Sequence, residues 1–191
     1  MERNLTHIAL FAALIAVLGL VPKIDLVSGV PITAQSMGIM LCGTVLGARR
    51  GALAVLLFLA LVALGLPLFS GGRGGIGVFM GPSMGYLVGF PIAAFVTGLI
   101  VEKWQGPIAV AAFAGAVIGG IIVLSGCGIV GFRVYSVLIA EGVPDAKTFT
   151  WAQAVAAASP FIIGDVIKAG LAAGITRGLA RVRPASVLSR S

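Results

Sequence analysis

Long apolar runs follow one another along the chain, separated by short segments rich in charge, glycine or proline. An α-helix needs about 20 apolar residues to cross a bilayer, and most of these runs come close to that length. The pattern therefore predicts a bundle of six transmembrane helices, at about residues 5–21, 33–47, 51–66, 83–101, 107–130 and 160–175, followed by a basic tail over 176–191.

Several helix ends have a local physical reason. Pro22 ends the first run, because the residue before a proline avoids the helical conformation. Before the last run, Ser159 and Pro160 occupy favourable N-cap and N1 positions. Residues 131–153 are more polar and are expected to form a connection.

Composition supports a membrane protein. The 191 residues are 59% hydrophobic and only 10% charged, whereas a soluble domain carries roughly 45–50% apolar and about 25% charged residues. A soluble globule and a disordered chain are both excluded by these proportions. Six helices use about 120 residues. We therefore expect a single membrane domain over 1–191, with no room for an ATPase domain.

The charge of +7 indicates topology and gives no sign of a nucleic-acid partner. The 13 basic residues stand singly or in pairs between apolar runs, as membrane anchors do. With the N-terminus inside, eight lie in inner segments and four in outer ones, and Lys168 lies within the last helix. This excess predicts that both termini are cytoplasmic and that the glycine-rich connection faces outward.

Asp165 and Lys168 stand out because they form the one ionisable pair expected within a span. They are three residues apart and share a helix face, with Asp165 about 7–8 Å below the outer end if the helix begins at Pro160. Charges inside a membrane are costly and by default suggest a functional site. The alternative is an ion pair that only fixes helix packing.

The glycine-rich segment 70–83 is either a flexible connection or part of a ligand site, since Phe79 and Met80 would suit an apolar lid. It matches no phosphate-binding loop, and Cys42 and Cys127 have no metal-site spacing. No catalytic constellation accompanies His7, so neither an enzyme nor a resident cofactor is expected. In the first helix, Ala9 and Ala13 form a small-residue stripe that serves either internal packing or subunit docking.

Three separated motifs resemble the BioY family, the biotin-binding S components of energy-coupling-factor (ECF) transporters. They are VPITAQSMG at 30–38, GGRGG with GPSMGY at 71–75 and 81–86, and IGDVIK at 163–168. The resemblance covers about residues 5–175. It implies a six-helix protein of the prokaryotic cytoplasmic membrane that binds biotin near the outer face. It also implies a transmembrane coupling subunit and two cytoplasmic ATPases as partners, with Ala9 and Ala13 as the docking stripe.

The ligand that the resemblance implies suits the candidate residues. Asp165 can accept from the ureido N–H groups, and Lys168 can donate to the ureido carbonyl or the carboxylate. Further candidates are Gln35, Ser83 and Tyr86 as neutral hydrogen-bonding groups, Phe79 as an apolar cover, and Gly81 from the second motif. Family members often have glycine at the position of Met84 and some have a basic residue at that of Leu87, so the carboxylate partner stays open. A solitary biotin carrier, and a small membrane enzyme or channel, are the alternatives.

Overall fold

The computed structural model describes residues 2–26, 30–142 and 146–190, and this part of the chain contains helices and only isolated β-bridges. Two π-helical turns extend or join α-helices: η1 (Cys42–Leu46) continues α2, and η3 (Ile118–Val123) joins α5 to α6. The α-helices are α1 (Glu2–Leu18), α2 (Gln35–Leu41), α3 (Ala48–Ala63), α4 (Met84–Lys103), α5 (Ile108–Val117), α6 (Leu124–Leu138) and α7 (Trp151–Val182). The short 3-10 turns are η2 (Ile76–Met80), η4 (Ala140–Gly142), η5 (Pro184–Ser186) and η6 (Leu188–Arg190).

Three helical segments of the described chain are long and apolar enough to cross a membrane. They are Met84–Lys103, Ile108–Leu138 and Trp151–Val182. The helices α1 and α3 have 17 and 16 residues, or about 24–26 Å, which is somewhat less than a bilayer core of about 30 Å. The protein is therefore a multi-pass membrane protein, and the number of six spans stays a prediction.

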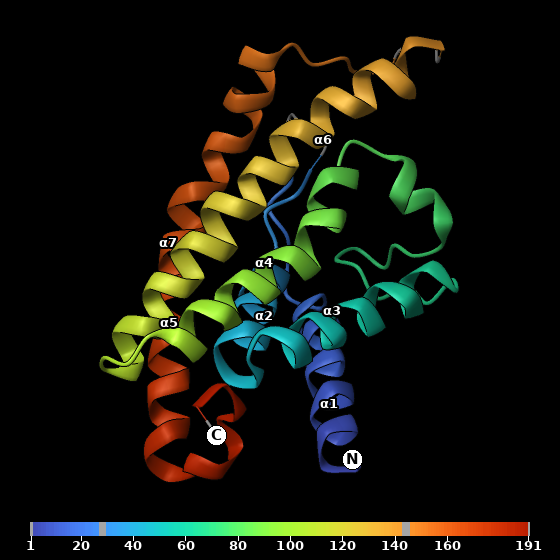
Figure 1. Ribbon diagram of the computed structural model, residues 1–191. Helices are drawn as coiled ribbons and strands as arrows, with labels where there is room; N and C mark the ends of the chain where they lie inside the picture. The colour runs from blue at the N-terminus through green and yellow to red at the C-terminus, as the bar shows by residue number, and fades with distance from the viewer. Residues whose placement is uncertain (1, 27–29, 143–145, 191) are drawn as a thin grey trace.

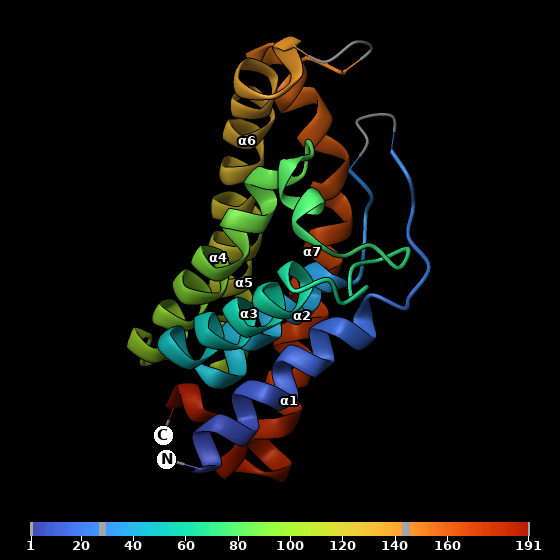
Figure 2. The ribbon, with the colours of Figure 1, turned by 90° about the vertical axis from the view of Figure 1, so that its right-hand side faces the viewer.

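Both termini lie at one end of the molecule, and the connection between α6 and α7 lies at the other end (Figures 1 and 2). Helix α4 crosses the centre of the bundle and packs on α3, α5 and α6, while α7 packs on α2, α5 and α6. This arrangement agrees with termini on the same side of a membrane, and their cytoplasmic location stays a prediction.

A close approach between α4 and α6 positions one wall of the bundle interior. Gly85 in α4 faces Cys127 and Gly131 in α6, and a Cβ atom at Gly85 would overlap the backbone of both residues. Because neither glycine carries a side chain at this crossing, the helix backbones pack directly. The next residue, Tyr86, then stacks edge-on against Phe132, with ring centroids 5.9 Å apart.

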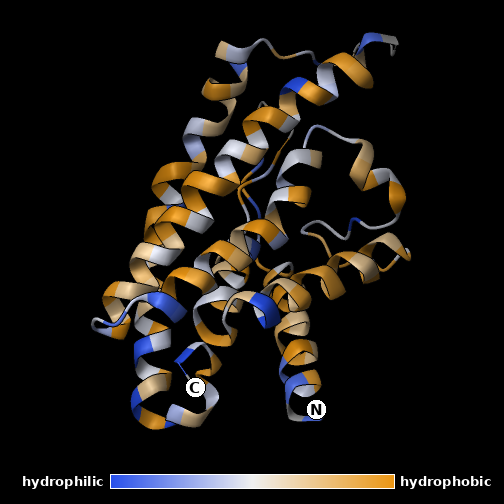
Figure 3. Ribbon diagram, in the orientation of Figure 1, coloured by the Kyte–Doolittle hydropathy of each residue, from blue (hydrophilic) through white to orange (hydrophobic). Residues whose placement is uncertain are grey.

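Helix α7 carries an apolar stripe on its outward side and buries Asp165 on its inward side. Ile163, Ile167, Leu171 and Ile175 follow one another at four-residue intervals and are all exposed. Asp165 is 5% exposed on the opposite side of the helix. The helices of the bundle are predominantly hydrophobic, and many hydrophilic residues gather near the end that carries both termini (Figure 3). An exposed apolar stripe of this length is suited to lipid.

The prediction that α7 begins at Ser159 and Pro160 is wrong. The helix begins at Trp151 after an N-cap at Thr150, whose hydroxyl accepts from the backbone N–H of Gln153 while the Gln153 side chain accepts from the backbone N–H of Thr150. Pro160 lies inside the helix. Asp165 is therefore about 21 Å from the start of α7, near its middle, instead of 7–8 Å from its end.

Other helix bounds also differ from expectation. Residues 131–138 continue α6, so Arg133 lies within a helix and the connection to α7 is shorter than predicted. The expected tail is largely folded: residues 176–182 belong to α7, and η5 and η6 fold back on the bundle. There the Ser189 hydroxyl donates to the Thr44 carbonyl at 2.6 Å. Helix α1 ends at Leu18 instead of 21, and α3 spans Ala48–Ala63 instead of 51–66.

Candidate functional site

A narrow cavity lies between the starts of α2 and α4, the middle of α7 and the turn that follows α3. The centres of water-sized molecules can occupy about 70 Å³ of it, which is room for several waters. Its apolar wall includes Val30, Phe69, Val78, Leu87, Phe90 and Phe161. Its polar lining consists of Thr33, Gln35, Ser36, Arg73, Ser83, Tyr86, Asp165 and Lys168. Segments distant in sequence thus place a few polar groups in an apolar enclosure, as ligand sites do.

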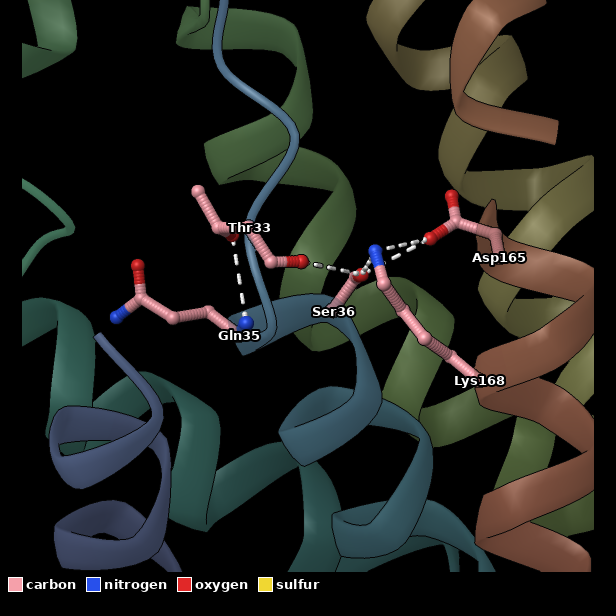
Figure 4. A network of polar contacts seen from close by, with 5 residues as sticks. All are labelled: Thr33, Gln35, Ser36, Asp165 and Lys168. Atoms are coloured by element: carbon pink, nitrogen blue, oxygen red, sulfur yellow. Dashed lines mark hydrogen bonds and ion pairs between the residues drawn. The ribbon is translucent and has the colours of Figure 1, made fainter. Parts of the chain in front are cut away.

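The polar centre of the cavity is a network of Ser36, Asp165 and Lys168 (Figure 4). The Lys168 Nζ donates to Asp165 Oδ1 at 2.8 Å and to Ser36 Oγ at 2.9 Å, and Ser36 Oγ donates to Asp165 Oδ1 at 3.0 Å. The Asp165 and Lys168 side chains are 7% and 15% exposed. The predicted contact between the two charges is confirmed, and through Ser36 it also joins α7 to α2.

Acceptor capacity remains in this network. The hydrogen bonds to the Asp165 carboxylate within the described chain all use Oδ1. A carboxylate offers about four lone-pair sites on its two oxygens, so Oδ2 can still accept a ligand N–H. The ion pair has no net charge, and its location among apolar side chains makes it costly unless it serves packing, binding or both.

Tyr86 contributes a polar group without a partner. Its hydroxyl is buried and makes no hydrogen bond within the described residues, although the ring lines the cavity. The ring packs 5.5 Å from that of Phe161, which holds the phenol in place. An unpaired buried hydroxyl costs about 1–3 kcal/mol. A ligand acceptor or donor at this position would remove that cost.

Gln35 lines the cavity, yet its amide is largely committed to the backbone. Its Nε2 donates to the carbonyls of Ile15 at 3.2 Å and Leu68 at 3.1 Å, and its Oε1 accepts from the Ser70 N–H at 3.3 Å. Both amide N–H groups are therefore used, and the side chain is 1% exposed. The structure favours a structural role for Gln35, as a tie between α1 and the turn after α3.

The candidate residues of the glycine-rich segment 70–83 differ in whether they line the cavity. Ser83 lines the cavity and is the N-cap residue of α4, but its side chain makes no capping hydrogen bond. Phe79 is half-buried against the core and lies outside the cavity lining. Gly81 borders a second, more open hollow together with Arg73 and Ser83. Roles of Phe79 and Gly81 in ligand contact therefore require a different placement of this segment.

Comparisons with known proteins agree on one family. The family model for BioY matches residues 2–185. This chain belongs to the BioY family. A biotin transporter BioY of Rhodobacter capsulatus is 54% identical over 192 residues, covering 100% of both chains. A biotin transporter BioY of Rhizobium etli is 48% identical over 184 residues, covering 93% of this chain and 92% of the relative.

A solved structure supports the same assignment. The crystal structure of the S component for biotin from an ECF-type ABC transporter matches with a TM-score of 0.81 and 31% identity, covering 94% of this chain and 92% of that chain. The expected BioY resemblance is thus confirmed. The protein is a member of a membrane transport family, with no relative among these described as an enzyme.

Three polar residues of the cavity lining, Thr33, Ser36 and Arg73, were not among the sequence candidates. Ser36 lies in the first motif and had a detectable signal, because it stands beside Gln35 at a polar helix start. Its contact with Asp165 joins residues 129 positions apart, which no local pattern predicts. Arg73 was interpreted as a topology charge, although its side chain lines the cavity.

The alanine stripe of α1 faces outward. Ala9 and Ala13 are exposed, whereas Ala12 is 3% exposed and packs inward. Internal packing within this chain therefore does not explain Ala9 and Ala13. Their role in docking the transmembrane coupling subunit stays a prediction.

Proposed function

We propose that this chain is the biotin-binding S component of an ECF-type transporter and takes up biotin across a prokaryotic cytoplasmic membrane. The observation that carries the proposal is the buried network of Ser36, Asp165 and Lys168 beside the unpartnered Tyr86 hydroxyl, in a cavity with an apolar wall. Membership of the BioY family and the names of its relatives supply the ligand.

The chemistry of biotin suits these groups. Asp165 Oδ2 accepts a ureido N–H, Lys168 and the Tyr86 hydroxyl donate to the ureido carbonyl, and the aromatic rings Phe69, Phe90 and Phe161 cover the apolar thioether ring.

The wider assembly follows from the family. We infer six spans with both termini cytoplasmic, one membrane domain over 1–191 without a resident cofactor, and lipid around the bundle. A transmembrane coupling subunit and two cytoplasmic ATPases supply the energy, and the exposed Ala9 and Ala13 stripe of α1 is the contact for the coupling subunit. Small residues support such contacts because they allow helices to approach closely in lipid.

Equilibrium binding of labelled biotin to the purified protein tests the ligand and the site together. We expect saturable binding by the unaltered protein and a loss of at least about 10-fold in affinity for Asp165→Asn and for Lys168→Ala. Asp25→Asn and Lys103→Ala are matched controls, since both side chains are exposed and outside the cavity lining. Unaltered affinity in both site variants would exclude this site.

Uptake by intact cells tests the assembly. Cells with this chain, the coupling subunit and the ATPases should accumulate labelled biotin, and cells with this chain alone should bind biotin without accumulating it. Equal accumulation in both would show a solitary carrier and would contradict the dependence on partner ATPases.

A further inference from the structure

Arg73 is placed in the cavity by a short, well-anchored turn. Phe69 and Arg73 pair through two backbone hydrogen bonds, from Phe69 N to Arg73 O at 3.0 Å and from Arg73 N to Phe69 O at 3.3 Å. Between them, Gly71 and Gly72 have φ values of +80° and +69°, a region that glycine adopts without strain. The Phe69 ring packs edge-on against Phe58 at 5.3 Å. The guanidinium is therefore carried on a positioned segment, although it belongs to a connection between helices.

The charge of Arg73 is not balanced by protein. The ion pairs of the described residues are Lys23 with Asp25 and Lys168 with Asp165, so no described carboxylate pairs with Arg73. Its Nε donates to the Ser70 carbonyl at 3.3 Å, and the described chain offers no acceptor to its two terminal amino groups. Arginine has five N–H donors in a planar fork, so four of them stay available for a ligand.

The cavity consequently carries one net positive charge. The charges of Asp165 and Lys168 cancel in their ion pair, and the positive charge of Arg73 remains uncompensated in the lining. A half-buried guanidinium beside an apolar wall is stabilised by an anion, and a carboxylate matches its fork with two parallel hydrogen bonds. The start of α4 adds to this potential, because its N-cap Ser83 makes no capping hydrogen bond and lines the same cavity.

We propose that Arg73 binds the carboxylate of the ligand and makes the site selective for the free acid. Because Arg73 borders both the cavity and the more open hollow formed with Gly72, Gly81 and Ser83, the carboxylate lies toward that opening. The uncharged ring system lies at Asp165 and Lys168. This inference rests on the proposed function, since it assigns one end of a biotin molecule.

A comparison of two ligands tests the inference on the unaltered protein. Biotinamide keeps the rings and the chain but replaces the carboxylate with a neutral amide. We expect the protein to bind biotin about 10- to 100-fold more tightly than biotinamide, as one charge-assisted bidentate contact provides. Equal affinities would overturn the inference while leaving biotin binding, and thus the proposed function, intact. Absence of biotin binding would refute the proposed function itself.

A variant then assigns the preference to Arg73. Arg73→Met should lose most of the affinity for biotin, keep its affinity for biotinamide within about 3-fold, and so bind both alike. Arg73→Lys should retain part of the preference, because it keeps the charge without the fork. Arg133→Met removes a half-buried arginine outside the cavity lining and should leave the preference unchanged. An equal loss for both ligands in Arg73→Met would overturn the assignment, since that result indicates a structural role.

Discussion

Replacement of Lys168 by methionine separates the stability of the site from its binding function. The substitution keeps a long apolar stem but removes the charge that pairs with Asp165 at 2.8 Å. It leaves a carboxylate that is 7% exposed, with the Ser36 hydroxyl as its one described donor. Removal of one partner from a buried ion pair costs about 3–5 kcal/mol, and the remaining hydrogen bond places Lys168→Met near the lower value.

The double variant Asp165→Asn with Lys168→Met provides the decisive comparison. It removes both charges and keeps the approximate volume, so its stability should return to within about 1 kcal/mol of the unaltered protein. Neither variant should bind biotin with normal affinity, because each lacks at least one of the two charged groups assigned to the ureido ring. The single variant should therefore lose both stability and biotin binding, whereas the double variant should lose biotin binding alone.

Thermal unfolding in detergent, with and without biotin, measures both quantities. For a chain of this size, about 3 kcal/mol corresponds to a decrease of about 6–12 °C in Tm. The matched control is Lys23→Met, which breaks an exposed Lys–Asp pair and should cost less than about 1 kcal/mol. A double variant as unstable as Lys168→Met would refute the reasoning, because the loss could then not arise from an unpaired charge.

Three further substitutions test other parts of the structure. Tyr86→Phe removes an unpartnered hydroxyl, so ligand-free Tm should not fall while biotin affinity decreases about 2- to 10-fold by equilibrium binding. Gln35→Leu removes three hydrogen bonds to backbone groups and should lower Tm by more than Lys23→Met does, since it leaves those groups unpaired. Ala9→Leu combined with Ala13→Leu should abolish co-purification with the coupling subunit and leave biotin affinity unchanged, because both side chains are exposed and distant from the cavity lining. Intact co-purification would contradict the docking role.

The sequence predicted the helical content better than the helix ends. Apolar runs locate helices because each run must face lipid or core, and residues 33–47 closely match α2 with η1. The start of α7 was misplaced because Ser159 and Pro160 imitate a helix start. The true start is a capping box at Thr150 and Gln153, and Pro160 is tolerated inside the helix.

The sequence predicted those site residues that lie close together along the chain. Asp165 and Lys168 meet because three residues separate them on one helix face, which spacing alone determines. Ser36 and Arg73 reach the same cavity through the packing of α2 and the turn after α3 on α7, and these contacts depend on the fold. Likewise, a polar residue at a helix start looks available for a ligand, and only the structure shows that the Gln35 amide is bound to the backbone.

The most direct test of the central claim is a binding measurement on the purified protein with a small panel of vitamins. Isothermal titration with biotin, thiamine and riboflavin, each also titrated into Asp165→Asn, reports ligand and site in one experiment. The structure and the family predict saturable binding of biotin alone, and its loss in Asp165→Asn. Binding of thiamine or riboflavin in place of biotin, or biotin binding of equal affinity in Asp165→Asn, would contradict the account.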